Sequence, residues 1–320
     1  MKVQKIPGTG LNPSCICLGT AEMGTVMDGE DSFRMLDFFA ERGGNFLDSA
    51  HVYGDMSSPE RGMSEKTIGR WLRARGCRSR MIVATKGAHP ALQAMNVPRL
   101  SRPEILCDLQ ESLENLGTDC IDLYWLHRDD PNRGVAEIIE TLNEQVKAGL
   151  IRHYGLSNWQ LPRFRAAVAH ARNHGLAEPV ASQILWSLAK PNHGVITDPM
   201  IAVMDRATWE YHNSQGIAVI PFTAQARGYF TKLRLGLPMQ DWVRATYESP
   251  GNLERFRRAT CLAMELNTTV EAVALAYLIN QPFPAIPIIS SRDTGQLEAS
   301  LAASDLTLPA GTISYLNLEL

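Results

Sequence analysis

The chain has 320 residues, of which 45% are hydrophobic and 20% charged, enough for a large core beneath an ordinary polar surface. Its net charge of −3 gives no basic footprint for nucleic acid or an anionic membrane surface, and no apolar run approaches the ~20 residues of a membrane span. The N-terminal stretch MKVQKIPGTG lacks the apolar segment of a secretory signal, and the six cysteines form no C-x-x-C pair. We therefore expect a cytoplasmic protein with reduced thiols and no metal centre.

Eight short apolar runs, bounded by Gly, Asn or Asp, recur along the chain with helical patterns between them. Most are continuous rather than alternating, as expected for strands that are buried on both faces. The predicted strands cover residues 14–20, 45–50, 81–87, 120–127, 151–158, 180–188, 216–222 and 285–290.

Amphipathic segments with recognisable caps lie between these strands. One follows Asp31 and ends near Gly43, and another opens at Ser101 and ends at Gly117. Strands that alternate with helices predict parallel βαβ units, a pattern that a doubly wound open sheet shares. The count of eight favours a closed (β/α)8 TIM barrel that forms a single domain over residues 1–320.

Two stretches interrupt the alternation of strands and helices. Residues 88–100 follow the third predicted strand, and residues 223–250 form a long connection after the seventh. Long ordered loops in a compact domain are usually functional. After a last helix at about 293–303, only a short tail remains.

Ionisable side chains follow the apolar runs at the ends of three neighbouring strands. Asp48 ends the second strand, Lys86 the third and His127 the fourth, and Tyr53 lies in the loop after the second. Each residue alone has an ordinary structural explanation, such as a turn-capping carboxylate or a buried histidine. Because reactive groups of parallel barrels gather at the carboxyl ends of the strands, the combination predicts a catalytic site.

Several motifs carry a family resemblance. They are CLGTAEMG (17–24), NFLDSAHVYGD (45–55), SEKTIGRWL (64–72), IVATKG (82–87), IDLYWLH (121–127), GLSNW (155–159) and SSRDTGQLEAS (290–300). In their order and spacing they resemble the aldo-keto reductases over nearly the whole chain. The resemblance implies that Tyr53 donates the proton, that Lys86 and Asp48 activate it, and that His127 orients a substrate carbonyl.

The chemistry of carbonyl reduction needs these residue types. A hydride moves from a nicotinamide to the carbonyl carbon, and the oxygen must gain a proton as charge builds on it. A free tyrosine is a poor acid at neutral pH, but a nearby ammonium such as that of Lys86 favours the phenolate. Asp48 would hold the lysine charged, and His127 would offer an N–H to the developing oxyanion.

The expected cofactor is NADP(H), preferred over NAD(H). No G-x-G-x-x-G follows the first strand, so a Rossmann site is not supported. By resemblance, Ser157, Asn158 and Gln183 hold the carboxamide, and Trp186, where the family usually has a tyrosine, stacks on the nicotinamide ring. Arg292, near a helix N-terminus, favours a 2′-phosphate. The complete set of predicted cofactor contacts is Gly19, Thr20, Asp48, Ser157, Asn158, Gln183, Trp186, Phe222, Thr223, Gln225, Arg227, Gly228, Lys232, Ile289, Ser290, Ser291, Arg292, Gln296 and Ser300.

The predicted substrate pocket is polar at its rim, where HRDD (127–130) follows the fourth strand. We therefore expect a small hydroxylated or sugar-derived carbonyl compound, with an open pocket or one completed by the 88–100 loop or a second subunit. The predicted substrate contacts are Met23, His51, Arg128 and Trp159.

Two other function classes fit the sequence. Lys86 could form a Schiff base in a lyase, or the chain could be a cofactor-binding regulatory subunit with little turnover. The sequence leaves the oligomeric state open.

Overall fold

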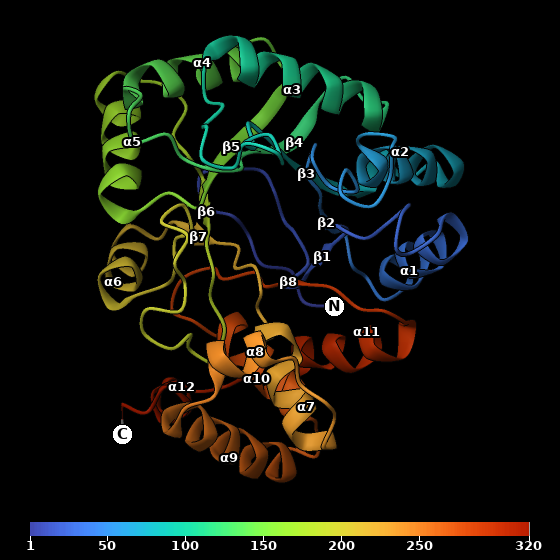
Figure 1. The fold of residues 1–320 in the computed structure, drawn as a ribbon, viewed down its shortest axis with the longest axis vertical. Coiled ribbons are helices and arrows are strands. Elements are labelled where there is room, and N and C mark those ends of the chain that lie inside the picture. The colour runs from blue at the N-terminus through green and yellow to red at the C-terminus, as the bar shows by residue number, and fades with distance from the viewer. Residues whose placement is uncertain (320) are drawn as a thin grey trace.

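The computed structural model describes residues 1–319 and contains one sheet of eight parallel strands with helices around it (Figure 1). The strands are β1 (Cys17–Gly19), β2 (Phe46–Asp48), β3 (Ile82–Gly87), β4 (Ile121–Leu126), β5 (Ile151–Ser157), β6 (Ala181–Gln183), β7 (Ala218–Val219) and β8 (Ile288–Ile289). Each lies within one of the predicted strand segments. Their spatial order is β7-β6-β5-β4-β3-β2-β1-β8, so each strand from β1 to β6 lies beside the next strand along the chain, and β8 lies beside β1.

The sheet closes into a barrel between β7 and the segment just before β8. Val219 of β7 forms a parallel bridge with Ala285, just before β8, and its amide donates to the Pro284 carbonyl at 2.8 Å. The amide of Ile286 in turn donates to the Val219 carbonyl at 2.9 Å. This closure confirms the predicted (β/α)8 TIM barrel.

Helices form the outer layer. They are α1 (Gly29–Glu41), α2 (Met63–Arg75), α3 (Arg102–Leu116), α4 (Val135–Lys147), α5 (Leu161–Asn173), α6 (Arg206–Gln215), α7 (Tyr229–Leu235), α8 (Asp241–Tyr247), α9 (Pro250–Glu265), α10 (Val270–Ile279), α11 (Thr294–Leu301) and α12 (Ala310–Asn317). Helices α1 to α6 follow one another around the strands, whereas α7 to α10 and α12 gather at the lower end of the view in Figure 1.

The caps of α3 are as predicted, with Ser101 and Glu104 in a capping box and Gly117 left-handed at the C-cap. The predicted start of α1 is wrong. The N-cap is Asp28, whose carboxylate accepts from the Asp31 amide at 2.9 Å, and Asp31 lies in the first turn. An acidic side chain is favourable at both positions, so the sequence did not distinguish them.

The stretches expected to lack regular structure are only partly irregular. Residues 88–100 contain neither helix nor strand, as predicted, but the 223–250 connection contains α7 and α8, and the tail contains α12. These helices are only seven or eight residues long, too short for a helical hydrophobic period to be recognised.

The barrel interior is filled by side chains from the strands, including Phe46, Leu123 and Trp125. Ile6 and Leu11 of the N-terminal segment belong to the same cluster, so this segment seals one end of the barrel. On β5, Gly155 faces Trp125 so closely that a Cβ there would overlap the indole ring. The interior is therefore a packed core, and a ligand site has to lie at a barrel end.

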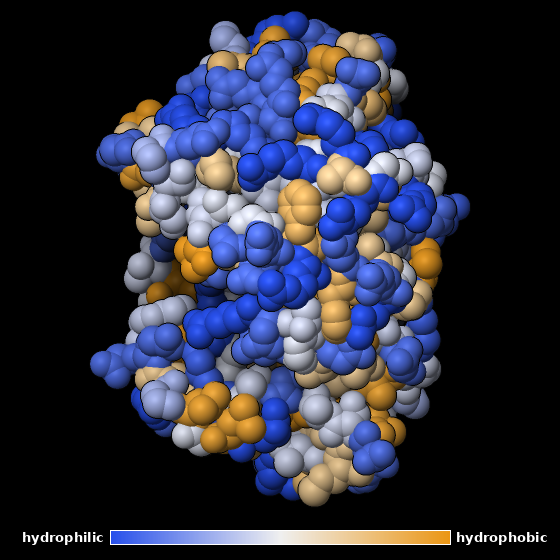
Figure 2. All heavy atoms as spheres, turned by 90° about the vertical axis from the view of Figure 1, so that its right-hand side faces the viewer, coloured by the Kyte–Doolittle hydropathy of each residue, from blue (hydrophilic) through white to orange (hydrophobic). Residues whose placement is uncertain are grey.

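The face that carries α1 and α2 is mostly hydrophilic, with hydrophobic residues scattered over it (Figure 2). Between residues 1 and 319 no single helix has the length and apolar composition of a membrane span. Only α9 and α10 together pass that test, as a pair bent by 100°, and α10 is buried in the core. All six cysteines are free thiols.

Candidate active site

The predicted catalytic residues meet where β2, β3 and β4 end. Asp48 pairs with Ala84, two residues before Lys86 along β3. Backbone hydrogen bonds fix the loops that follow: the His51 amide donates to the Lys86 carbonyl at 2.8 Å, and the His127 amide donates to the Gly87 carbonyl at 2.9 Å. The loop after β2 therefore places Tyr53 above the end of β3.

Lys86 is the centre of the cluster. Its Nζ donates to Asp48 Oδ2 at 2.5 Å, to the Ser49 carbonyl at 2.7 Å and to Tyr53 Oη at 3.2 Å. The side chains of Lys86 and Asp48 are 1% and 2% exposed. The other carboxylate oxygen of Asp48 accepts from Gln183 Nε2 at 3.0 Å. All three ammonium protons and both carboxylate oxygens thus have partners.

The ammonium of Lys86 stays charged. Burial alone would lower its pKa, but the Asp48 carboxylate and Tyr53 outweigh burial and raise the pKa above the ordinary lysine value. A Schiff-base lysine needs the opposite, a lowered pKa that frees the amine as a nucleophile. The geometry therefore favours an electrostatic role for Lys86 over the lyase alternative.

His127 is a neutral imidazole beside Tyr53. Their rings meet edge to face with centroids 5.8 Å apart. Burial, with the nearby Lys86 cation, lowers the pKa of His127 far below the ordinary histidine value. Its Nδ1 is buried and has no hydrogen-bond partner among residues 1–319. Tyr53 and His127 thus form a pair of groups able to donate to one oxygen atom.

The residues predicted to bind a carboxamide lie next to this cluster. Ser157 pairs with Gln183 across β5 and β6. Asn158 has a positive φ of 61°, and its Nδ2 donates to the His127 carbonyl and to Ser157 Oγ, each at 3.3 Å. Because Gln183 also binds Asp48, these amides and the catalytic cluster form one network.

The segment after β7 has an unusual backbone. Thr223, Ala226 and Arg227 have φ between 49° and 57°, and Gly228 has φ of 75°. Several non-glycine residues in the left-handed region cost energy, and such residues cluster at ligand sites. Successive backbone N–H groups in this kind of conformation form a concave anion site. The segment therefore fits a pyrophosphate.

Side chains from β8 and α11 approach the same segment. Gln225 Nε2 donates to Ser300 Oγ at 3.0 Å, and the Arg292 amide donates to Gln296 Oε1 at 3.2 Å. Burial lowers the pKa of Lys232, and the charge of Arg292 lowers it further. At the end of β1, a Cβ on Gly19 would lie 2.8 Å from Ile288 and 3.2 Å from Ser290 Oγ. These residues fit a nucleotide phosphate.

The amide of Trp186 donates to the Phe222 carbonyl at 3.4 Å, but its side chain packs among the outer helices. Its indole stacks on Phe283 with centroids 6.0 Å apart and meets Tyr277 edge-on. It lines a groove of about 990 Å3 between α6, α10 and α12. This packing among the outer helices does not fit the predicted stacking on a nicotinamide ring. Phe222 follows closely after the end of β7 and is partly exposed. It is therefore the aromatic residue that lies at this strand end.

The predicted substrate contacts are only partly brought together. Met23 is buried in the outer core, and Trp159 is buried beneath the Arg163 guanidinium. Arg128 donates to the Met200 carbonyl at 3.0 Å, but its Nε has no partner within residues 1–319. His51 lines a cavity that also includes His89, whose ring packs on His127.

The two aspartates of HRDD form ion pairs within the protein. Asp129 accepts two 2.8 Å hydrogen bonds from Arg163, and Asp130 pairs with Arg133. The expectation that these acids face a substrate is therefore not supported. They stabilise the loop after β4.

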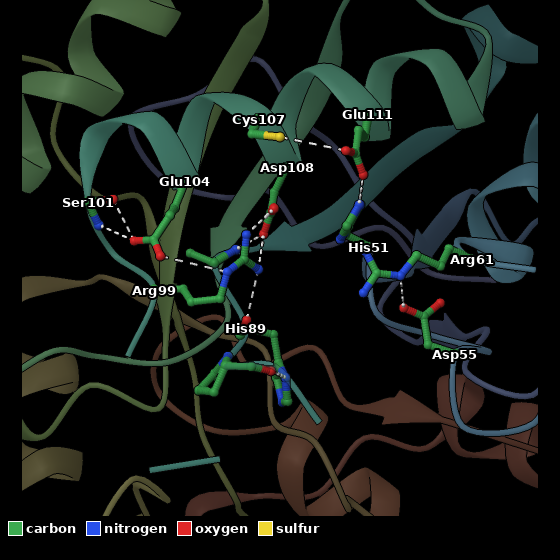
Figure 3. Close-up of polar contacts among 12 residues, drawn as sticks. His51, Asp55, Arg61, His89, Arg99, Ser101, Glu104, Cys107, Asp108 and Glu111 are labelled. Carbon is green, nitrogen blue, oxygen red and sulfur yellow. Dashed lines mark hydrogen bonds and ion pairs between the residues drawn. The ribbon is translucent and has the colours of Figure 1, made fainter. Parts of the chain in front are cut away.

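The cavity that His51 lines has a volume of about 490 Å3 and lies between residues 51–61, residues 89–93 and α3 (Figure 3). Residues 89–93, which belong to the 88–100 loop, form one wall of this cavity. His51 Nε2 donates to Glu111 Oε2 at 2.6 Å. The sequence reasoning missed His89, whose ring packs on His127; its only signal was its position three residues after Lys86.

Comparison with known proteins identifies the family of the chain. The Aldo/keto reductase family model matches residues 15–317. The chain is 28% identical to an aryl-alcohol dehydrogenase [NADP(+)] of Phanerodontia chrysosporium, over 98% of this chain and 84% of that protein. It is 29% identical to the uncharacterized oxidoreductase YrpG of Bacillus subtilis (strain 168), over 97% and 93%. A thermostable aldo-keto reductase solved with the inhibitor epalrestat matches 99% of both chains with a TM-score of 0.74 at 20% identity, a likeness of fold alone.

Proposed function

The chain belongs to the aldo/keto reductase family, and from this premise we propose that it is an NADP(H)-dependent carbonyl reductase, acting on a small hydroxylated aldehyde or ketone with Tyr53 as the proton donor. That it is an oxidoreductase follows from the family and from its named relatives. The observation that carries the specific proposal is the contact between Lys86 Nζ and Tyr53 Oη at 3.2 Å, beside a buried Asp48.

The nicotinamide, when bound, supplies a hydride to the carbonyl carbon. Tyr53 donates its proton to the carbonyl oxygen, and the Lys86 ammonium stabilises the phenolate that remains. Asp48 holds that ammonium in place and charged. His127, because it is neutral, donates one N–H to the same oxygen without adding a second positive charge beside Lys86.

For the cofactor we propose Ser157, Asn158 and Gln183 at the carboxamide and Phe222, in place of Trp186, against the nicotinamide ring. The backbone of residues 223–228 would hold the pyrophosphate. Arg292 and Lys232 would bind the 2′-phosphate, which supports NADP(H) over NAD(H). The name of the Phanerodontia chrysosporium relative, with its NADP(+), agrees with this preference.

The proposed substrate is polar because the cavity beside the cluster is lined by charged and polar side chains, among them His51, Arg99 and Glu111. The name of the aryl-alcohol dehydrogenase makes aromatic aldehydes the comparison class. A screen of aldehydes and ketones of graded polarity separates the two classes. A clear preference for apolar aromatic aldehydes would contradict the polar substrate.

Substitution of Tyr53 tests the mechanism. We expect Tyr53→Phe to lower kcat by about 10³-fold, because the positioned proton donor is lost, while NADPH affinity measured by fluorescence stays unchanged. Near-normal turnover in this variant would remove Tyr53 from the mechanism. Wild-type protein that binds NADPH but reduces no carbonyl would instead favour the regulatory-subunit alternative.

A further inference from the structure

His89 occupies a position one ring further from Tyr53 than His127. Its imidazole meets the His127 ring edge-on with centroids 4.6 Å apart, and His127 meets Tyr53 in the same way at 5.8 Å. The three rings therefore form a row. His89 is therefore the side chain that packs next to the pair proposed to hold a carbonyl oxygen.

The backbone of His89 is held firmly. Arg99 Nη1 donates to the His89 carbonyl at 3.1 Å, and the same guanidinium makes 3.1 and 2.8 Å hydrogen bonds to the two oxygens of Asp108 on α3 (Figure 3). A residue whose backbone is fixed in this way loses little freedom when it binds a ligand group. The row of rings is thus prearranged.

The tautomer of His89 is determined by its neighbour. Its Nδ1 lies 2.7 Å from the Pro90 carbonyl oxygen, which can only accept, so Nδ1 carries the hydrogen. Burial and the nearby Arg128 and Arg99 lower the pKa of His89 and keep the ring neutral. Its Nε2 therefore has a free lone pair, and within residues 1–319 no donor is bonded to it. His127 offers a donor to the substrate, whereas His89 offers an acceptor.

The cavity next to His89 also presents a hydrogen-bond acceptor to a ligand. The Glu111 carboxyl has a lowered pKa because His51 donates to it, so it is an ionised acceptor. The two arginines that line the cavity are both paired with carboxylates, Arg99 with Asp108 and Arg61 with Asp55. A hydroxylated substrate suits these walls better than a carboxylate does.

We propose that His89 is a specificity-determining residue, whose Nε2 accepts a hydrogen bond from a hydroxyl on the carbon next to the reacting carbonyl. This inference rests on the proposed carbonyl reduction and names its substrate class as 2-hydroxy aldehydes and ketones. A site that hydrogen-bonds a substrate hydroxyl discriminates against an analogue that lacks it, because the acceptor loses that partner once the substrate covers it.

A matched pair of substrates tests the proposal. Steady-state kinetics with NADPH compares 2-hydroxypropanal with propanal for the wild type and for His89→Phe, which keeps an aromatic ring but has no acceptor. We expect the wild type to favour 2-hydroxypropanal in kcat/KM by about tenfold or more. His89→Phe should lose this preference, so its kcat/KM for 2-hydroxypropanal should fall by a larger factor than its kcat/KM for propanal.

Two further variants make the result specific. His89→Gln, whose amide oxygen can accept, should restore part of the preference, and His174→Phe, at an exposed histidine after α5, should leave it unchanged. Equal losses with both aldehydes, or a wild type without preference, would overturn the role of His89 while the proposed reduction stands. A wild type that oxidises NADPH with neither these aldehydes nor any other carbonyl would overturn the proposed function and the role of His89 with it.

Discussion

The two halves of the proposed site are built differently. Where β2, β3 and β4 end, the lysine and carboxylate are almost fully buried, and every polar atom of that pair has a partner within the protein. Beyond β7 and β8, by contrast, Ser290 and Arg292 are exposed, and the main preparation is a strained backbone at residues 223–228. The proton-transfer half is arranged before any ligand binds. The phosphate half has a preformed backbone conformation, but few of its side chains are fixed. Reaction chemistry needs fixed geometry, while an anion needs mainly charge and N–H groups.

The largest expected effect concerns the buried pair. Lys86→Met should lower kcat by about 10³-fold and lower the free energy of unfolding by about 3–5 kcal/mol, because Asp48 is left buried without its counter-charge. Urea denaturation and steady-state kinetics measure the two effects. The double variant Asp48→Asn/Lys86→Met should recover part of the stability and none of the turnover. If Lys86→Met has the same free energy of unfolding as the wild type, the Asp48–Lys86 pair is not prearranged.

On the exposed half, Arg292→Ala should raise the KM for NADPH by about 10- to 100-fold, since a charge-assisted contact to the 2′-phosphate is lost. The KM for NADH should change less than about twofold. Arg34→Ala, at an exposed arginine of α1, is the control and should change neither. An equal rise in KM for both cofactors would mean that Arg292 does not bind the 2′-phosphate.

The pH dependence of stability distinguishes the buried half from the exposed one. Because the pKa of His127 is lowered on folding, His127 binds a proton below about pH 6.5 in the unfolded chain but not in the folded protein. The unfolded state then holds more protons, so the free energy of unfolding falls as the pH drops, by up to about 1.4 kcal/mol per pH unit.

Urea denaturation at several pH values between 5 and 7.5 measures this slope, which His127→Gln should reduce. His212, whose pKa burial lowers to about 4, contributes with the same sign in both proteins and cancels in the comparison. His174→Gln, at an exposed histidine, is the matched control. An unchanged slope in His127→Gln would mean that this ring accepts a proton when folded.

The same contrast explains what the sequence could predict. Asp48, Lys86 and His127 each end an apolar run, so the strand pattern alone placed them at one barrel end. Trp186 could not be placed, because β6 ends at Gln183 and the alternation of faces does not continue beyond a strand. His89 lies in a loop without periodicity, and its contact with His127 is purely tertiary. For the phosphate half, only resemblance indicated the residues, since positive φ at Ala226 and Arg227 has no signature in those residue types.

The smallest effect tests the backbone of the phosphate half. Gly228 has φ of 75°, and a Cβ there would meet only Lys232 Cε, at 3.9 Å, so Gly228→Ala costs about 1 kcal/mol through the backbone rather than through a clash. If this conformation holds the pyrophosphate, which both cofactors share, the KM values for NADPH and NADH should rise by the same factor of about fivefold, with kcat unchanged.

Gly236→Ala is the matched control, because Gly236 has φ of 62° with nothing within 4 Å of its Cβ position. It should lose similar stability and leave both KM values alone. A rise in KM for Gly236→Ala as well would show that general loosening of α7, and not the shape of residues 223–228, determines cofactor affinity.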